Sequence, residues 1–130
     1  MVRSDAAVWF EFVESKIFSK QVRELSSEIL AKIQSDLISN PECGPIVKGT
    51  HGVRKARVGD PTTGRGKSGS YRYLYLYLQS AGRIHLLYLF SKGEQADLSP
   101  EQKRIIGSLS REIRREFESH ENSKAPKDSD

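Results

Sequence analysis

The chain has 130 residues and a formal charge of +4, from 21 Lys and Arg against 17 Asp and Glu. One domain of this length buries roughly two-thirds of its unfolded surface, so its core needs no metal, and Cys43 has no partner for an internal disulfide. Charged residues interrupt the most apolar stretch before the roughly 20 residues of a membrane span, and no cleavable signal is visible, so we expect a cytoplasmic protein without membrane contact.

The first third of the chain predicts one strand followed by helical structure. Residues 8–13 alternate aromatic and other side chains, which favours an opening strand. From Ser15 to Asn40 apolar residues recur at helical spacing, which predicts one amphipathic helix or two helices separated near Ser26-Ser27. Asn40-Pro41 ends this region because the residue before a proline is pushed out of the helical conformation.

The middle of the chain predicts a hairpin that follows a glycine-rich loop. Residues 53–58 favour a short basic strand, and the loop 59–70 has four glycines and no apolar side chain to anchor it. Residues 71–78 then alternate tyrosines on one face with Arg72 and leucines on the other. After a turn at Ala81-Gly82, residues 84–90 are nearly all apolar, so we expect an antiparallel hairpin whose second strand is central in the sheet.

The last third predicts one helix and a tail. Ser99, Pro100 and Gln102 form a helix start, with a capping serine and a glutamine three residues later, and the apolar stripe continues to His120. Residues 122–130 have no large apolar side chain, which predicts a disordered tail. The elements together indicate one α+β domain over residues 1–121.

Positive charge is concentrated in the middle of the sequence. Residues 48–92 contain nine Lys and Arg against Asp60 alone, a net charge of +8, whereas the remaining residues carry −4. This asymmetry favours a polyanionic partner. The alternative is a solvated basic surface that keeps the protein soluble.

Several kinds of catalytic site are poorly supported by the residue types. The three histidines are far from one another and from Cys43, so we expect no metal or other cofactor. Residues 61–68 approximate a P-loop, but a proline replaces its first glycine and a strand follows instead of a helix. Cleavage of RNA without a metal is compatible with these residue types, because RNA carries its own 2′-hydroxyl nucleophile. Arginines can stabilise the phosphoryl oxygens, and a lysine can move protons.

A series of short segments matches a known family in order and spacing. They are an aromatic strand, a helical region ending at Asn40-Pro41, Gly52-Val53-Arg54-Lys55-Ala56-Arg57, Gly64-Arg65-Gly66-Lys67-Ser68-Gly69, Tyr71-Arg72, Leu89-Phe90-Ser91-Lys92 and Asp97-Leu98-Ser99. Through them, from Val8 to Ile113, the sequence resembles the RelE-like toxins of bacterial toxin–antitoxin pairs, in particular the HigB-type branch. The resemblance implies a small antiparallel sheet with N-terminal helices on one face, a basic groove on the other, and a C-terminal helix.

The same resemblance implies a function and a set of site residues. The activity would be ribosome-dependent endonucleolytic cleavage of messenger RNA by 2′-hydroxyl attack without metal. The expected partners are the ribosome, mRNA and a cognate antitoxin, for which a helix-turn-helix protein is one option. The predicted catalytic residues are Arg57, Lys67, Arg72 and Lys92, and the predicted RNA-binding residues are Arg54, Lys55, Arg65 and Tyr75, the last by stacking on a base.

Two alternatives and one geometric question stay open at this point. The chain could be a ParE-like inhibitor of gyrase, or a module that binds RNA or antitoxin without catalysis. The tyrosine that many relatives use as proton donor has no clear equivalent, so Tyr73 or Tyr75 is the substitute. Because Arg72 shares its strand face with leucines, it must lie beyond the edge of the core or the strand must carry a bulge.

Overall fold

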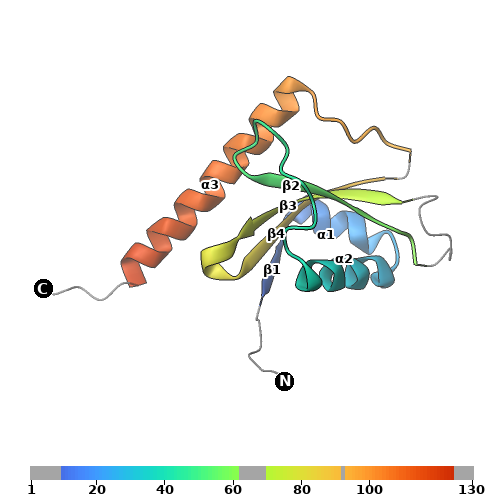
Figure 1. The fold of residues 1–130 in the computed structure, drawn as a ribbon, viewed down its shortest axis with the longest axis horizontal. Coiled ribbons are helices and arrows are strands. Elements are labelled where there is room, and N and C mark those ends of the chain that lie inside the picture. Colours follow the sequence, from blue (N-terminus) through green and yellow to red (C-terminus); the bar gives the residue numbers. More distant parts are fainter. Residues whose placement is uncertain (1–9, 62–69, 92, 125–130) are drawn as a thin grey trace, which may run out of the picture.

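The computed structural model describes residues 10–61, 70–91 and 93–124, and this part of the chain forms an α+β fold (Figure 1). The predicted fold class is therefore confirmed. The described elements are, in chain order, β1 (Glu11–Glu14), α1 (Lys16–Arg23), α2 (Ser27–Ser39), β2 (Val53–Val58), β3 (Tyr71–Leu78), the short 3-10 turn η1 (Gln79–Ala81), β4 (Arg83–Phe90) and α3 (Pro100–Lys124).

The sheet is mixed, with the strand order β1-β4-β3-β2. The β3–β4 hairpin is antiparallel and β4 lies inside the sheet, as the sequence predicts. Strand β1 instead pairs with β4 in parallel, which departs from an all-antiparallel sheet. The long chain between these two strands sets no direction for their pairing, whereas a tight turn would force an antiparallel one.

Helices α1 and α2 cover the face of the sheet that carries the tyrosines. Ser15 caps α1 by accepting a hydrogen bond from the Phe18 amide at 3.0 Å, and Ser26 caps α2 in the same way through Glu28. The helical region is thus two helices, one of the two predicted arrangements. Their buried side chains pack on the rings of β3 in a core that includes Phe18, Ile33, Leu37, Tyr73 and Tyr75.

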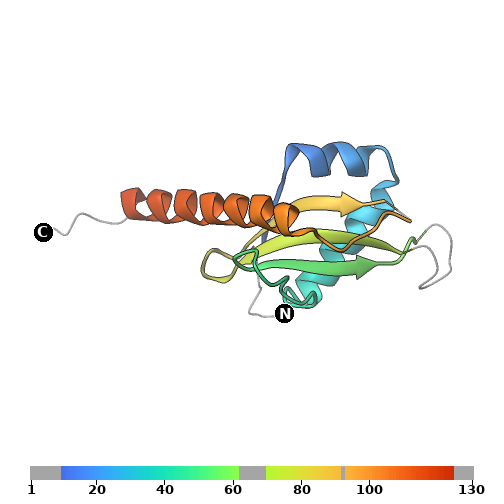
Figure 2. The same ribbon diagram turned by 90° about the horizontal axis from the view of Figure 1, so that it is seen from above.

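Helix α3 packs on the opposite face, so both faces of the sheet carry a core. Leu74, Leu76 and Leu78 of β3 lie in this second core with Ile113 and Phe117 of α3. Figure 2 shows α3 extending well past the end of the sheet. The helix continues through Lys124, three residues into the predicted tail, and residues 125–130 lie outside the described part.

The start and the middle of α3 are fixed by polar contacts. The amide of Ser99 donates to Gln102 Oε1 at 2.9 Å and the amide of Gln102 to Ser99 Oγ at 3.1 Å, the predicted capping pair. Farther along, the carbonyl of His51 accepts from Ser110 Oγ at 2.7 Å and from Arg114 Nη2 at 3.2 Å.

None of the helices in the described ranges has the length and apolarity to cross a bilayer.

Candidate nucleic-acid interface

Two arginines lie directly opposite each other on neighbouring strands. Arg57 of β2 pairs in register with Arg72 of β3, on the α3 side of the sheet. Within the described part of the chain, neither side chain has a hydrogen bond or an ion pair. Like charges directly across a strand pair are destabilising, so this pair lowers the stability of the fold unless an anion lies between them.

The position of Arg72 answers the geometric question raised by the sequence. Strand β3 alternates strictly, with its tyrosines toward α1 and α2 and its leucines toward α3. The bulge lies in β4, where the register shifts between Leu74 and Tyr75 and Leu87 is the extra residue. Arg72 therefore lies on the leucine face, at the end of the strand beyond Leu74, and remains partly exposed.

Lys55 is a third cation on the same face, and it has structural partners. Its Nζ donates to the carbonyl of Ala96 at 2.9 Å and lies 3.7 Å from the carboxylate of Asp97. Both partners belong to the connection between β4 and α3. Lys55 therefore ties this connection to β2, next to the two arginines.

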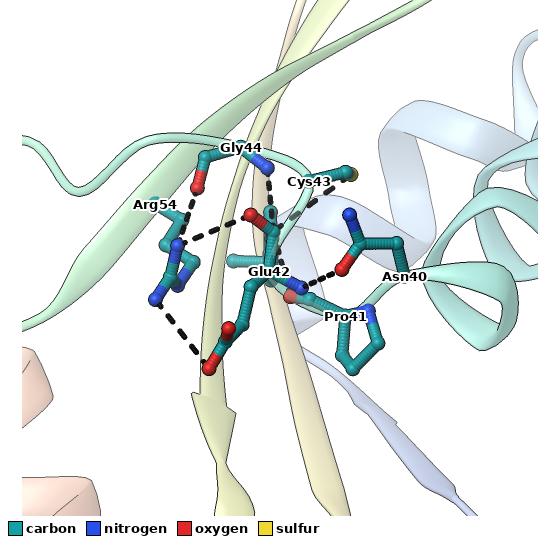
Figure 3. Close-up of polar contacts among 7 residues, drawn as sticks. Asn40, Pro41, Glu42, Cys43, Gly44 and Arg54 are labelled. Atoms are coloured by element: carbon teal, nitrogen blue, oxygen red, sulfur yellow. Dashed lines mark hydrogen bonds and ion pairs between the residues drawn. The ribbon is translucent and has the colours of Figure 1, made fainter.

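Arg54 points to the other face and holds the segment that follows α2 (Figure 3). Its Nη1 donates to the carbonyl of Gly44 at 2.8 Å and to that of Glu42 at 3.3 Å, and its Nη2 lies 4.0 Å from the Glu42 carboxylate. These acceptors occupy much of its donor fork. The structure therefore gives Arg54 a structural role, and its predicted contact with RNA stays a prediction.

Tyr75 is fully buried under the same segment, with 0% of its surface exposed. Its hydroxyl donates to the carbonyl of Pro41 at 2.8 Å and accepts from the amide of Gly44 at 3.0 Å, and burial raises its pKa. No face of the ring is open to a base, so the stacking prediction is wrong for this structure. Tyr73 is equally buried, and neither tyrosine is placed to exchange a proton with a substrate.

A hollow of about 560 Å³ runs along the outer edge of β2. The cations Lys55, Arg57 and Arg72 line one side of it. The other side is formed by Asp36, Ser39, Cys43 and Pro45, together with Ala56 of the strand. The Asp36 carboxylate is already paired with Lys32 Nζ at 2.6 Å, so the charge available to a ligand in the hollow is mainly positive.

Three predicted site residues cannot be placed. Arg65, Lys67 and Lys92 lie outside the described residues. Of the predicted set, the structure thus brings together Lys55, Arg57 and Arg72, and it separates Arg54 and Tyr75 from them by the thickness of the sheet. In the described ranges, no three His, Cys, Asp or Glu side chains are grouped as metal ligands.

Tyr88 is an aromatic residue on the arginine face that sequence reasoning missed. It pairs in register with Leu74, is partly exposed, and donates its hydroxyl to Glu94 Oε2 at 3.0 Å. The bulge in β4 sets which way it points. Because residues 84–90 are nearly all apolar, the sequence carries no alternation from which this orientation could be predicted.

No family model matches the sequence. Three solved structures of the E. coli RelE toxin match the fold, each with a TM-score of 0.50. A double arginine-to-alanine mutant in the free state is 16% identical over 67% of this chain and 86% of that chain. The intact RelBE toxin–antitoxin complex is 18% identical over 67% of this chain and 100% of that chain. The isolated toxin is 17% identical over 82% of this chain and 98% of that chain. At these identities the match concerns the fold, which is RelE-like.

Proposed function

We propose that this chain is the toxin of a toxin–antitoxin pair and cleaves messenger RNA in the ribosome without a metal. The observation that carries the proposal is the pair Arg57 and Arg72, which face each other without partners in the described structure beside a basic hollow. A phosphodiester placed between two guanidinium groups would replace their repulsion with charge-assisted hydrogen bonds. The RelE-like fold supports the same reading.

The chemistry requires little more than positioning and charge. The 2′-hydroxyl gives up its proton as its oxygen attacks the adjacent phosphorus, the bond to the 5′-oxygen breaks, and that oxygen takes up a proton. A 2′,3′-cyclic phosphate remains on the upstream fragment. Negative charge grows on the non-bridging oxygens during this step, and preorganised cations stabilise it best. We assign this role to Arg57 and Arg72, and we keep Lys67 and Lys92 as proposed catalytic residues and Arg65 as a proposed RNA contact on the strength of the sequence.

The proposed partners follow from the same site. The RelBE structure is that of a toxin with its antitoxin, and we propose that a cognate antitoxin of this chain, a helix-turn-helix protein being one option, blocks access to the basic hollow. The ribosome would present the mRNA. Membership in the HigB-type branch remains a prediction from sequence.

Mapping of mRNA ends after controlled expression tests the proposal. We expect new 5′ ends within translated messages and growth arrest, both lost in the Arg57→Ala/Arg72→Ala double variant. The matched control is Arg104→Ala/Arg111→Ala, which removes two exposed arginines of α3 away from the hollow. Cuts that persist in the first variant would refute the assigned site. Intact messages with double-strand DNA breaks would indicate a gyrase inhibitor, and intact RNA and DNA a non-catalytic binding module.

A further inference from the structure

The basic hollow has two walls of different chemistry. Arg57 and Arg72 belong to the wall formed by the strands, and Asp36 and Ser39 belong to the wall formed by α2. The arginines project toward α3, whereas α2 packs on the opposite face of the sheet, so the two walls lie on either side of the outer edge of β2. The volume of about 560 Å³ is within the range of small-molecule sites, so the hollow has room for one nucleotide.

The wall on α2 has an unused acceptor and an unused hydroxyl. Asp36 Oδ1 accepts from Lys32 Nζ at 2.6 Å, whereas Asp36 Oδ2 and the Ser39 hydroxyl have no hydrogen bond within the described part of the chain. The two residues are three positions apart in α2, which makes their side chains neighbours on the helix surface. The Lys32 ammonium offsets the Asp36 charge, so this wall can accept hydrogen bonds from a base with little repulsion of the phosphate.

An acceptor beside a hydroxyl distinguishes among the RNA bases. A carboxylate only accepts hydrogen bonds, and a serine hydroxyl can donate one. Guanine is the one RNA base whose pairing edge has two adjacent N–H donors, at N1 and N2, next to an acceptor, O6. Adenine and cytosine offer a carboxylate one exocyclic donor beside an unprotonated ring nitrogen, and uracil offers one N–H between two carbonyls. Guanine therefore matches this wall with the most hydrogen bonds.

The two walls together fit one nucleotide of a single-stranded RNA. We propose that Asp36 and Ser39 select guanine at the nucleotide whose phosphate lies between Arg57 and Arg72. The Asp36 carboxylate accepts from guanine N1 and N2, and the Ser39 hydroxyl donates to O6. One nucleotide can bridge the walls because its phosphate and the pairing edge of its base lie at opposite ends of the molecule, and this edge is free in unpaired RNA. The assignment rests on the proposed function, which places the phosphate between the two arginines.

NMR titration of the full chain with the 5′- and 3′-monophosphates of the four nucleosides tests this selection. Because a bidentate contact to a base discriminates by roughly tenfold, we expect the guanosine nucleotide to bind about tenfold more tightly than the adenosine nucleotide. Asp36→Asn keeps the size of the side chain but replaces an acceptor oxygen with a donor, so this ratio should fall below about twofold. The matched control, Lys32→Gln, removes the ion pair but keeps the carboxylate, and it should keep the preference for guanosine. The same spectra show whether each variant is folded.

The outcomes separate the selection of guanine from the proposed function. Equal affinities for the four nucleotides, no binding of the guanosine nucleotide, or an unchanged ratio in Asp36→Asn would overturn the selection. Message cleavage that depends on Arg57 and Arg72 would in that case still support the ribonuclease. Selective binding of guanosine nucleotides by a chain that cuts no message would instead contradict the proposed function and leave the selection in place. Where messages are cut, we expect guanosine to be enriched beside the mapped ends, and this enrichment should disappear in Asp36→Asn.

Discussion

Arg54 and Arg57 belong to the same strand, only three residues apart, and they differ in almost everything but charge. Arg54 faces the segment that follows α2 and is held there by the carbonyls of Glu42 and Gly44. Arg57 faces the α3 side, opposite Arg72, and within the described structure has no acceptor at all. A cation counted in the sequence thus becomes a strong candidate for ligand binding when the fold leaves its donors unused.

The largest effect is expected when one of the unused guanidinium donors is removed. We expect Arg72→Ala to lower the rate of RNA cleavage by roughly 10²- to 10³-fold, the usual loss on removing one preorganised donor to a developing oxyanion. The free energy of unfolding should stay the same or rise by a few tenths of a kcal/mol, because a like-charge pair is relieved. Ribosome-programmed cleavage assays and urea unfolding measure the two effects. A folded variant of unchanged activity would remove Arg72 from the site.

The reverse result is expected for Arg54. Its replacement in Arg54→Ala leaves two backbone carbonyls without their charged donor, so we expect a loss of about 1 to 3 kcal/mol in the free energy of unfolding. Arg57→Ala is the matched variant on the same strand and should change this free energy by less than about 0.5 kcal/mol. Equal losses in the two variants, measured by urea unfolding, would show that the contacts of Arg54 carry no special weight.

Tyr73 and Tyr75 of β3 also differ in whether their polar group has partners, and we expect smaller effects from replacing them. Tyr75→Phe removes the acceptor of the buried Gly44 amide and the donor to Pro41, so we expect a loss of about 1 to 2 kcal/mol. Tyr73→Phe removes a hydroxyl that has no hydrogen-bond partner among the described residues, so stability should be unchanged or rise by up to about 1 kcal/mol. Thermal unfolding of both variants measures this difference. Two losses of similar size would mean that the Tyr73 hydroxyl is satisfied in solution.

Much of the fold could be predicted because the local signals agree with one another. The alternation of β3, the capping serines of both N-terminal helices and the start of α3 each involve residues close in sequence. The parallel pairing of β1 and the bulge in β4 could not be predicted, since both depend on contacts between segments far apart in the chain. The apolar run of β4 also hides which of its side chains faces α3.

The candidate site was predictable in part for the same reason. The pairing of Arg57 with Arg72 follows from strand register, and the sequence suggested both residues through charge and order. The burial of Tyr75 and the acceptors of Arg54 come from the segment after α2, which folds back over the strand edge. Alternation on β3 set the tyrosines on one face, but only tertiary packing determines that α2 covers this face.

The smallest expected effect concerns a carboxylate near the arginine face. Glu94 accepts from the Ser91 amide at 2.9 Å and from the Tyr88 hydroxyl at 3.0 Å, and the Ser91 bond is the main reason that its pKa is lowered. A carboxylate whose pKa is lower in the folded state stabilises the fold above its unfolded pKa, and this contribution disappears as the pH falls through the folded value.

We therefore expect Glu94→Gln to reduce the free energy of unfolding at pH 7 by less than about 1 kcal/mol, because solvent screens a group so near the surface. The difference in the free energy of unfolding between Glu94→Gln and the wild type should shrink below about pH 4. There the wild-type carboxylate becomes protonated and is neutral, like the glutamine side chain. Urea unfolding across this range measures it, and Glu116→Gln, at an exposed position of α3, is the control. A loss in the free energy of unfolding that stays constant down to pH 3 would mean that Glu94 stabilises the fold through packing and not through its charge. Glu94 would then differ from Arg54, whose charged donors are matched by their acceptors.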